Sequence, residues 1–136
     1  MTEKRVKEET WDDLEVFTSK GAKIRNPWVT ITDISAFHFN AAFVHQAAIA
    51  KSTHVILGYS PLKKAITFQF TSDPQAEGAL TLLQRPGGSS VGSRSFFNYY
   101  FLKPADLAGH YVPKKVKVPR VGELWAINLE SKLPEK

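Results

Sequence analysis

The chain has 136 residues, of which 43% are hydrophobic and 23% charged, as expected for a single globular domain with one core. It contains no cysteine, which excludes disulfides, thiolate metal sites and a cysteine nucleophile. Residues 1–13 hold five acids and three bases, so the remaining chain has eight acids against fifteen bases, a balance that suits an anionic partner or serves only to maintain solubility.

The N-terminal residues 1–10 are charged and lack a hydrophobic period, which predicts a flexible tail before a single domain over residues 11–136. This segment is too polar for a signal peptide. No apolar run approaches the roughly 20 residues needed to span a bilayer. We therefore expect a cytoplasmic protein with no membrane partner.

The first part of the domain changes from strand to helix. Hydrophobic residues at 14–17 predict a short strand, and the alternation over 28–32 predicts a second, half-buried one. Asn40 then predicts the N-cap of an alanine-rich helix over 41–50, with Phe43 on its apolar face.

The central region predicts a β-hairpin. Residues 54–59 and 65–71 have strand patterns and flank the turn sequence Ser60-Pro61-Leu62-Lys63-Lys64. In the second strand Ile66, Phe68 and Phe70 alternate with polar residues, so one face packs and the other is wetter. Residues 79–83 predict a further strand.

Residues 85–94 are rich in Gly and Ser and predict a flexible loop between two arginines. The pattern Gly88-Ser89-Ser90-Val91-Gly92 matches a hydrolase nucleophile elbow and is followed by Asp106 and His110 in the order that a catalytic triad requires. However, Pro86 and Gly87 interrupt the strand that an elbow needs. The stretch also has the glycine spacing of a phosphate-binding P-loop, but the essential lysine is missing. We expect neither pattern to be catalytic.

The last third predicts an aromatic helix and a final hairpin. Ser95 predicts the N-cap of a helix over 96–102. This helix is apolar on nearly all sides, so we expect it to be buried in the core or in a dimer interface. A basic segment then leads into a strand over 124–129. In that segment Lys115 and Lys117 alternate with valines, which places the two lysines on the opposite face.

The sequence does not support a metal site or acid–base catalysis. The four histidines are too far apart for a local metal motif, and the carboxylates are isolated beside turn residues. We expect no cofactor, no metal and no enzymatic activity.

Cations and aromatic residues on a sheet suggest a nucleic-acid surface, because bases stack on exposed rings while Lys and Arg neutralise phosphates. The candidate rings are Trp28, Tyr59, Phe68 and Phe70, each of which also suits a core. The candidate nucleic-acid-binding cations are Lys63, Lys64, Arg85, Arg94, Lys114, Lys115, Lys117 and Arg120.

The order of elements also suggests a family. The phrases concerned are Val29-Thr30-Ile31 leading to Phe39-Asn40-Ala41-Ala42, Val55-Ile56-Leu57-Gly58-Tyr59 with Ala65-Ile66-Thr67-Phe68, and Gly109-His110-Tyr111 before Gly122-Glu123-Leu124. Over about residues 11–130 the chain resembles the fold of the plant Whirly proteins, the eukaryotic positive transcriptional cofactor and small uncharacterised bacterial proteins grouped with them. The N-terminal half is also similar to swapped-hairpin transition-state regulators, which bind duplex DNA as dimers.

The Whirly-like resemblance implies a curved antiparallel sheet, homodimers or higher homo-oligomers, and single-stranded DNA held across the sheet. It carries over no binding residue, and the chain lacks the lysine-dense strand of the cofactor's domain.

We therefore expect an α+β domain with a largely antiparallel, curved β-sheet and one or two short helices. The predicted function is binding of single-stranded DNA or RNA with little sequence preference by a homo-oligomer. The alternative is a protein–protein interaction or structural domain whose aromatic helix forms an oligomer interface. A small-ligand site or an unrecognised enzyme is a third possibility.

Overall fold

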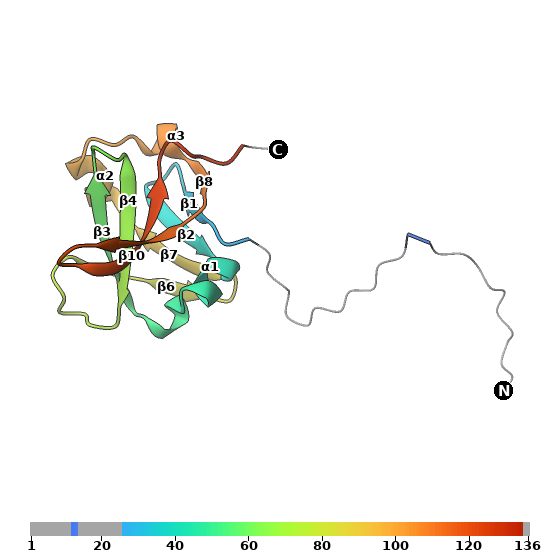
Figure 1. Ribbon diagram of the computed structural model, residues 1–136, viewed down its shortest axis with the longest axis horizontal. Helices are drawn as coiled ribbons and strands as arrows, with labels where there is room; N and C mark the ends of the chain where they lie inside the picture. Colours follow the sequence, from blue (N-terminus) through green and yellow to red (C-terminus); the bar gives the residue numbers. More distant parts are fainter. Residues whose placement is uncertain (1–11, 14–25, 135–136) are drawn as a thin grey trace, which may run out of the picture.

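The computed structural model describes residues 12–13 and 26–134, so the strand predicted at 14–17 lies outside the described residues (Figure 1). The described residues form two five-stranded sheets in which every pair of neighbours is antiparallel. In spatial order, sheet A contains β6 (Leu83–Arg85), β7 (Gly88–Gly92), β2 (Ala36–Asn40), β1 (Val29–Ile31) and β8 (Gly109–Tyr111). Sheet B contains β5 (Ala79–Thr81), β3 (His54–Ser60), β4 (Ala65–Thr71), β10 (Gly122–Asn128) and β9 (Lys114–Val118). The predicted α+β class with curved, antiparallel sheet structure is confirmed, with the strands divided between two sheets.

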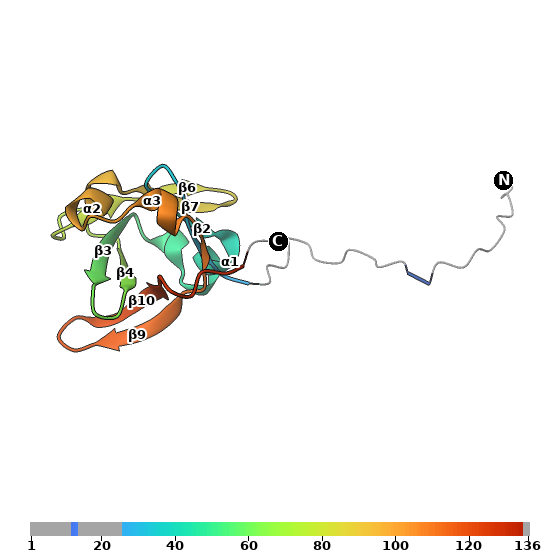
Figure 2. The ribbon, with the colours of Figure 1, turned by 90° about the horizontal axis from the view of Figure 1, so that it is seen from above.

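The core lies between the two sheets, which form separate layers in the view from above (Figure 2). Phe37 and Phe39 of sheet A meet Phe68 of sheet B edge to face, with ring centroids 5.1 and 5.3 Å apart. All three side chains are fully buried. Such edge-to-face contacts add to the stabilisation that burial of the rings already provides.

Short helices lie at the two ends of this sandwich (Figure 1). They are α1 (Ala41–Gln46) and the 3₁₀ turn η1 (Ile49–Lys51) at one end, and α2 (Arg94–Tyr99) and α3 (Pro104–Leu107) at the other. No helix of the described residues is long and apolar enough to cross a membrane.

Asn40 caps α1 as predicted, because its Oδ1 accepts a hydrogen bond of 3.0 Å from the backbone N–H of Phe43. The helix ends at Gln46 rather than at the predicted residue 50. Ala48 has a left-handed backbone, with φ of 53°, and this conformation separates α1 from η1.

The predicted central hairpin is confirmed. β3 and β4 pair from His54 opposite Thr71 to Ser60 opposite Ala65, and Ile66 and Phe68 are fully buried.

The strand predicted at 79–83 is in fact two strands that belong to different sheets. β5 pairs with β3, whereas β6 pairs with β7. The residue between them is Leu82, which is buried and whose backbone N–H bonds the carbonyl of Thr53 at 2.9 Å. One extended segment therefore links the two layers.

The prediction of a flexible loop at 85–94 is wrong. Most of this segment is β7, a strand paired on both sides with β2 and β6, in which Ser89 and Val91 are buried. Gly88 has φ of 147°, and a Cβ there would overlap the carbonyl oxygen of Phe39. This glycine therefore permits a close approach of two strands rather than loop flexibility.

The predicted Ser95 cap is also wrong, since α2 begins two residues earlier than predicted and Ser93 stands at its N-cap position. The Ser93 hydroxyl bonds the carbonyl of Val91 and does not cap the helix. Phe97 is buried as expected, but Tyr99 and Phe101 are 75% and 91% exposed. The aromatic segment is thus only half embedded in the core.

Candidate binding groove on sheet B

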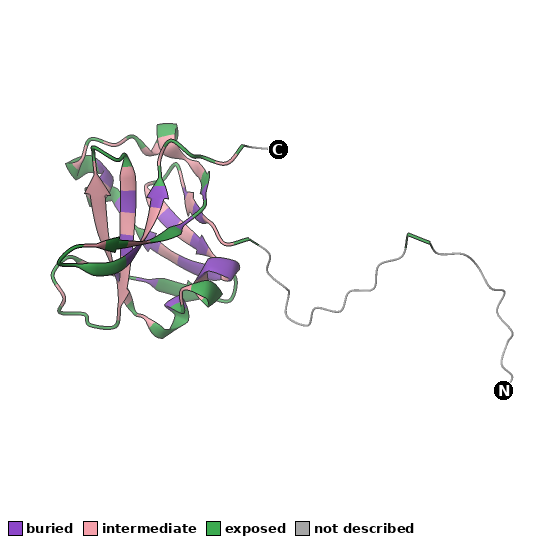
Figure 3. Ribbon diagram, viewed as in Figure 1, coloured by how far each residue is buried: buried purple, intermediate pink, exposed green. Residues whose placement is uncertain are grey.

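The outer face of sheet B is shaped into a groove by the β9–β10 hairpin. Only Trp125–Asn128 of β10 pair with β4, whereas the residues from Gly122 to Leu124 pair with β9 alone. The tip of the hairpin consequently leaves β4 and crosses in front of β3 and β4 (Figures 1 and 2). Much of the hairpin is exposed (Figure 3). We call the resulting hollow, of about 810 Å³, the sheet B groove.

Small side chains line the floor of the groove. Gly58, Thr67 and Ala126 lie directly opposite one another on three adjacent strands. A Cβ at Gly58 would overlap the hydroxyl oxygen of Thr67, so the glycine makes room for the threonine. Val116 and Leu124 form part of the wall contributed by the hairpin. The sequence does not single out these residues; the only local signal is a glycine inside a predicted strand, which indicates a close approach.

The charge along the groove has one sign. Two of its sixteen lining residues, Lys63 and Lys117, are charged, and none is acidic. A second hollow of about 540 Å³ at the hairpin tip shares Lys117 with the groove and is also lined by Arg120. Within the described part of the chain, none of these three cations forms an ion pair. Three of the predicted cations therefore border these two adjoining hollows, with Lys117 on the face of β9 opposite Val116.

Lys114 lies at the edge of the same sheet. It pairs with Ala126, which pairs with Thr67, so register places Lys114 on the face that forms the groove floor. Its side chain is exposed. It can reach a ligand that extends past the groove.

Two predicted cations are engaged with carboxylates. The Nζ of Lys64 lies 3.4 Å from Oε2 of Glu130, and the Nζ of Lys115 lies 3.6 Å from Oε1 of Glu123. The Lys115 ammonium also lies 5.4 Å from the ring centroid of Trp125. These pairs are exposed and each contributes little to stability, but they reduce the positive charge available to a ligand.

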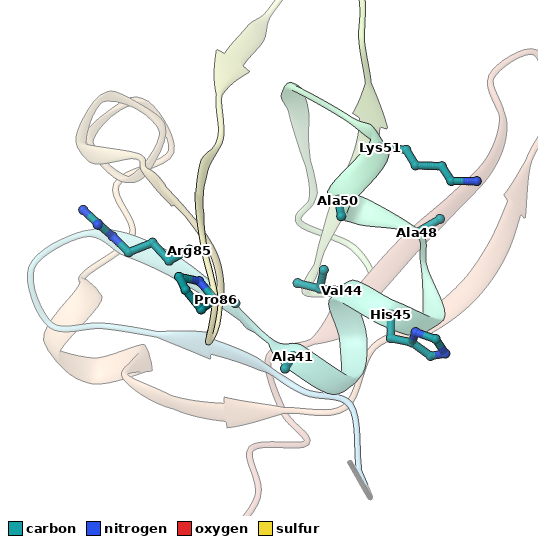
Figure 4. Close-up of a pocket in the computed structure, with 9 residues that line it drawn as sticks. Ala41, Val44, His45, Ala48, Ala50, Lys51, Arg85 and Pro86 are labelled. Atoms are coloured by element: carbon teal, nitrogen blue, oxygen red, sulfur yellow. The ribbon is translucent and has the colours of Figure 1, made fainter. Parts of the chain in front are cut away.

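Arg85 lies apart from the sheet B groove, in a cleft of about 490 Å³ between α1, η1 and the β6–β7 turn. His45 and Lys51 also line this cleft. Figure 4 shows Arg85 on one side and the other two on the opposite side, with the Arg85 side chain directed away from His45 and Lys51. The cleft therefore has a basic border but no point at which its cations converge on one anion.

Arg94 is the first residue of α2, at the end of the sandwich opposite α1 (Figure 1). The structure thus does not bring Arg85 or Arg94 together with the cations of the groove.

The candidate rings are mostly unavailable to a ligand. Phe68 is fully buried, and Phe70 packs edge to face on Phe39 with centroids 5.3 Å apart. Trp28 lies on sheet A, where it stacks on His110 at 4.9 Å. Tyr59 borders the groove, but it pairs with the buried Ile66 and its ring packs on Tyr100, with centroids 5.0 Å apart. The four rings therefore do not gather on one face of a sheet, and Phe68 lies in the core, as the alternation over 65–71 predicts.

The hydrolase-like pattern also has the wrong context. Ser90 lies inside β7, opposite His38 on β2 and Leu83 on β6, whereas a nucleophile elbow requires a sharp turn from a strand into a helix. His110 Nδ1 is 2.7 Å from the hydroxyl of Thr30. Over residues 12–13 and 26–134, no group of three or more His, Asp or Glu side chains could hold a metal ion.

Comparison of the chain with protein families, curated proteins and solved structures found no match. The Whirly-like resemblance accordingly stays a prediction, and the function has to be argued from the geometry of the site.

Proposed function

We propose that the protein binds single-stranded DNA or RNA in the sheet B groove with little sequence preference. The observation that carries this proposal is the lining of the groove, which combines an apolar floor with Lys63, Lys117 and the neighbouring Arg120 and contains no carboxylate. Phosphates contact the three cations, while bases lie against the floor.

A single strand fits this surface better than a duplex does. A duplex keeps its bases stacked inside and presents mainly phosphates, so an apolar floor would remain unused. A single strand exposes its bases, which can enter a hollow lined by Val116, Leu124 and Ile56. Most of the lining is apolar, and Ser60, Thr67 and Gln69 offer hydrogen bonds that any base can accept or donate, so we expect discrimination between bases to be weak.

Fluorescence anisotropy with a labelled oligothymidylate and a duplex of equal length tests the proposal. The variant Lys63→Ala/Lys117→Ala/Arg120→Ala removes the three groove cations. Each phosphate contact contributes about 0.7 to the slope of log K against log salt for single strands, so the variant should lower the slope by about 2. The single strand should bind the wild-type protein more tightly than the duplex.

A matched control separates the groove from the overall charge. Lys51→Ala/Arg94→Ala/Lys103→Ala removes the same number of positive charges at positions that do not line the groove. We expect this control to retain nearly all of the salt slope. Equal losses in both triple variants, or an affinity that does not depend on salt, would refute binding in the groove.

A further inference from the structure

The sheet B groove adjoins a second hollow at an open edge of β3. β5 pairs with β3 only from His54 to Ile56, so residues 57–60 of β3 have a partner strand on one side alone. A hollow of about 300 Å³ lies at this edge, between sheet B and α2. Leu57 lines both the groove and this hollow. A ligand that leaves the groove across β3 therefore meets α2.

The segment that begins with α2 carries two exposed aromatic rings. Tyr99 lines the hollow and is 75% exposed, and Phe101, two positions later, is 91% exposed. Tyr99 packs edge to face on Tyr100, with centroids 4.8 Å apart, and Tyr100 in turn contacts Tyr59 of β3 at 5.0 Å. Tyr99 is therefore held in place while most of its surface stays accessible. An aromatic side chain fixed in this way loses little entropy on binding.

Phe101 stands where glycine is the usual residue. The N–H of Leu102 bonds the carbonyl of Phe97 at 2.9 Å, and Tyr100 is the C-cap of α2, so Phe101 occupies the position after the cap in a Schellman motif. Its backbone is left-handed, with φ of 55°, a conformation that disfavours bulky side chains. Neither the backbone nor the core of the described structure accounts for a phenylalanine here, which makes the exposed ring a candidate for binding.

The two rings lie in a segment that has a cation at each end. Arg94 and Lys103 are both exposed, and neither forms an ion pair within the described part of the chain. The sequence has no acidic residue from 78 to 105, and none lines the hollow. The segment therefore attracts an anionic partner and presents two rings to it.

A single nucleic-acid strand supplies both of the groups that this segment can bind. Its phosphates suit the two cations, and its unstacked bases have flat faces that suit the rings. A duplex keeps those faces inside its own stack, and an acidic peptide would pair with the cations but offers no flat group to the rings. We infer that a single strand bound in the sheet B groove continues across the open edge of β3 and stacks bases on Tyr99 and Phe101, with Arg94 and Lys103 near its phosphates. This inference rests on the proposed function of the groove.

Fluorescence anisotropy of the full chain with oligothymidylates of increasing length tests this inference. The series runs from about 4 to about 16 nucleotides, the range of site sizes of known single-strand-binding domains. Tyr99→Ala/Phe101→Ala should bind the shortest strand like the wild type, because that strand fills only the groove. For the longest strand its affinity should fall by roughly tenfold or more, since each stacked base contributes to binding. The salt slope should not change, because the rings carry no charge.

The two cations should show the same dependence on length, but in the salt slope. Arg94→Ala/Lys103→Ala should lower the slope by about 1.4 for the longest strand, at about 0.7 for each phosphate contact, and leave the slope for the shortest strand unchanged. The groove variant and its control, which also lacks Arg94 and Lys103, are accordingly compared with the shortest strand.

Two single variants distinguish stacking from other apolar contact. Phe101→Trp keeps a stacking ring and should retain the affinity for the longest strand, whereas Phe101→Leu keeps only apolar bulk and should lose affinity. Leu83→Ala is the matched control, because Leu83 is 50% exposed on β6 and lines neither hollow, so it should bind every strand like the wild type.

The outcomes separate this inference from the proposed function. If Tyr99→Ala/Phe101→Ala binds every strand like the wild type, or loses affinity equally at every length, the stacking on α2 is refuted while the groove variant still tests the groove. Equal affinities of Phe101→Leu and Phe101→Trp would also refute it. A wild-type protein that binds no strand of any length overturns the proposed function and this inference together.

Discussion

Gly58 on the floor of the sheet B groove provides a sharp test of the packing described above. Gly58→Ala places a Cβ against the hydroxyl oxygen of Thr67, and such overpacking costs ~1–3 kcal/mol. Gly58 does not have a left-handed backbone, so alanine also gains ~0.4–1 kcal/mol by restricting the unfolded chain. We expect a net loss of roughly 1–2 kcal/mol in the free energy of unfolding, measured by urea titration with tryptophan fluorescence.

The sign of this effect should depend on residue 67. In a Thr67→Ala background the overlapping oxygen is gone, so the same Gly58→Ala change should stabilise the protein by ~0.4–1 kcal/mol. The two changes should therefore couple by about 1–3 kcal/mol in a double-mutant cycle. Thr67→Val is the control, because valine keeps the branched shape and should leave Gly58→Ala destabilising. If Gly58→Ala has the same cost in the wild type and in Thr67→Ala, the overlap is not its cause.

Three further predictions concern the fold outside the groove floor. Asn40→Ala should lower the free energy of unfolding by roughly 2–3 kcal/mol, because Oδ1 both caps α1 and accepts the N–H of Trp28 at 3.0 Å; Asn40→Asp, which keeps the acceptor, should cost clearly less in the same urea titration. Burial raises the pKa of Tyr111 above its ordinary value of 10.0, so stability is fully present below that pH and falls above it as the unfolded chain releases the proton. Thermal melts across this range should show a shallower fall for Tyr111→Phe, and an equal fall would contradict the assignment. Glu123→Gln breaks the exposed pair with Lys115 and should change the unfolding free energy by less than about 0.5 kcal/mol; a larger loss would show that the pair is not screened.

The fold was predictable from sequence where a pattern has one structural meaning. The alternation over 65–71 indicates a strand with one buried face, and Asn40 before an alanine-rich segment indicates a capped helix. The strand β7 was missed because glycine and serine are typical of loops, whereas Gly88 lies in a strand that passes close to the carbonyl of Phe39. That requirement depends on a neighbour almost fifty positions away in the chain, so no local pattern contains it.

The site was predictable only in part, for a related reason. The positive charge of Lys63, Lys117 and Arg120 is visible in the sequence, but their common surface depends on how far β10 stays paired with β4. Arg85 and Arg94 are equally basic in the sequence, yet the topology carries them to other surfaces. Charge composition therefore suggests a class of ligand, but it does not indicate which cations the topology brings to one surface.

The order in which strands join the sheets has a consequence for synthesis of the chain. β1 acquires its second neighbour only when β8 pairs with it, and the paired Thr30 and His110 are 80 residues apart. β4 likewise acquires its second neighbouring strand only when β10 pairs with it. Until the last segment leaves the ribosome, both sheets have an open edge with unpaired backbone groups. A chain that ends before residue 109 would present both edges together, and we expect such fragments to aggregate rather than to fold partially.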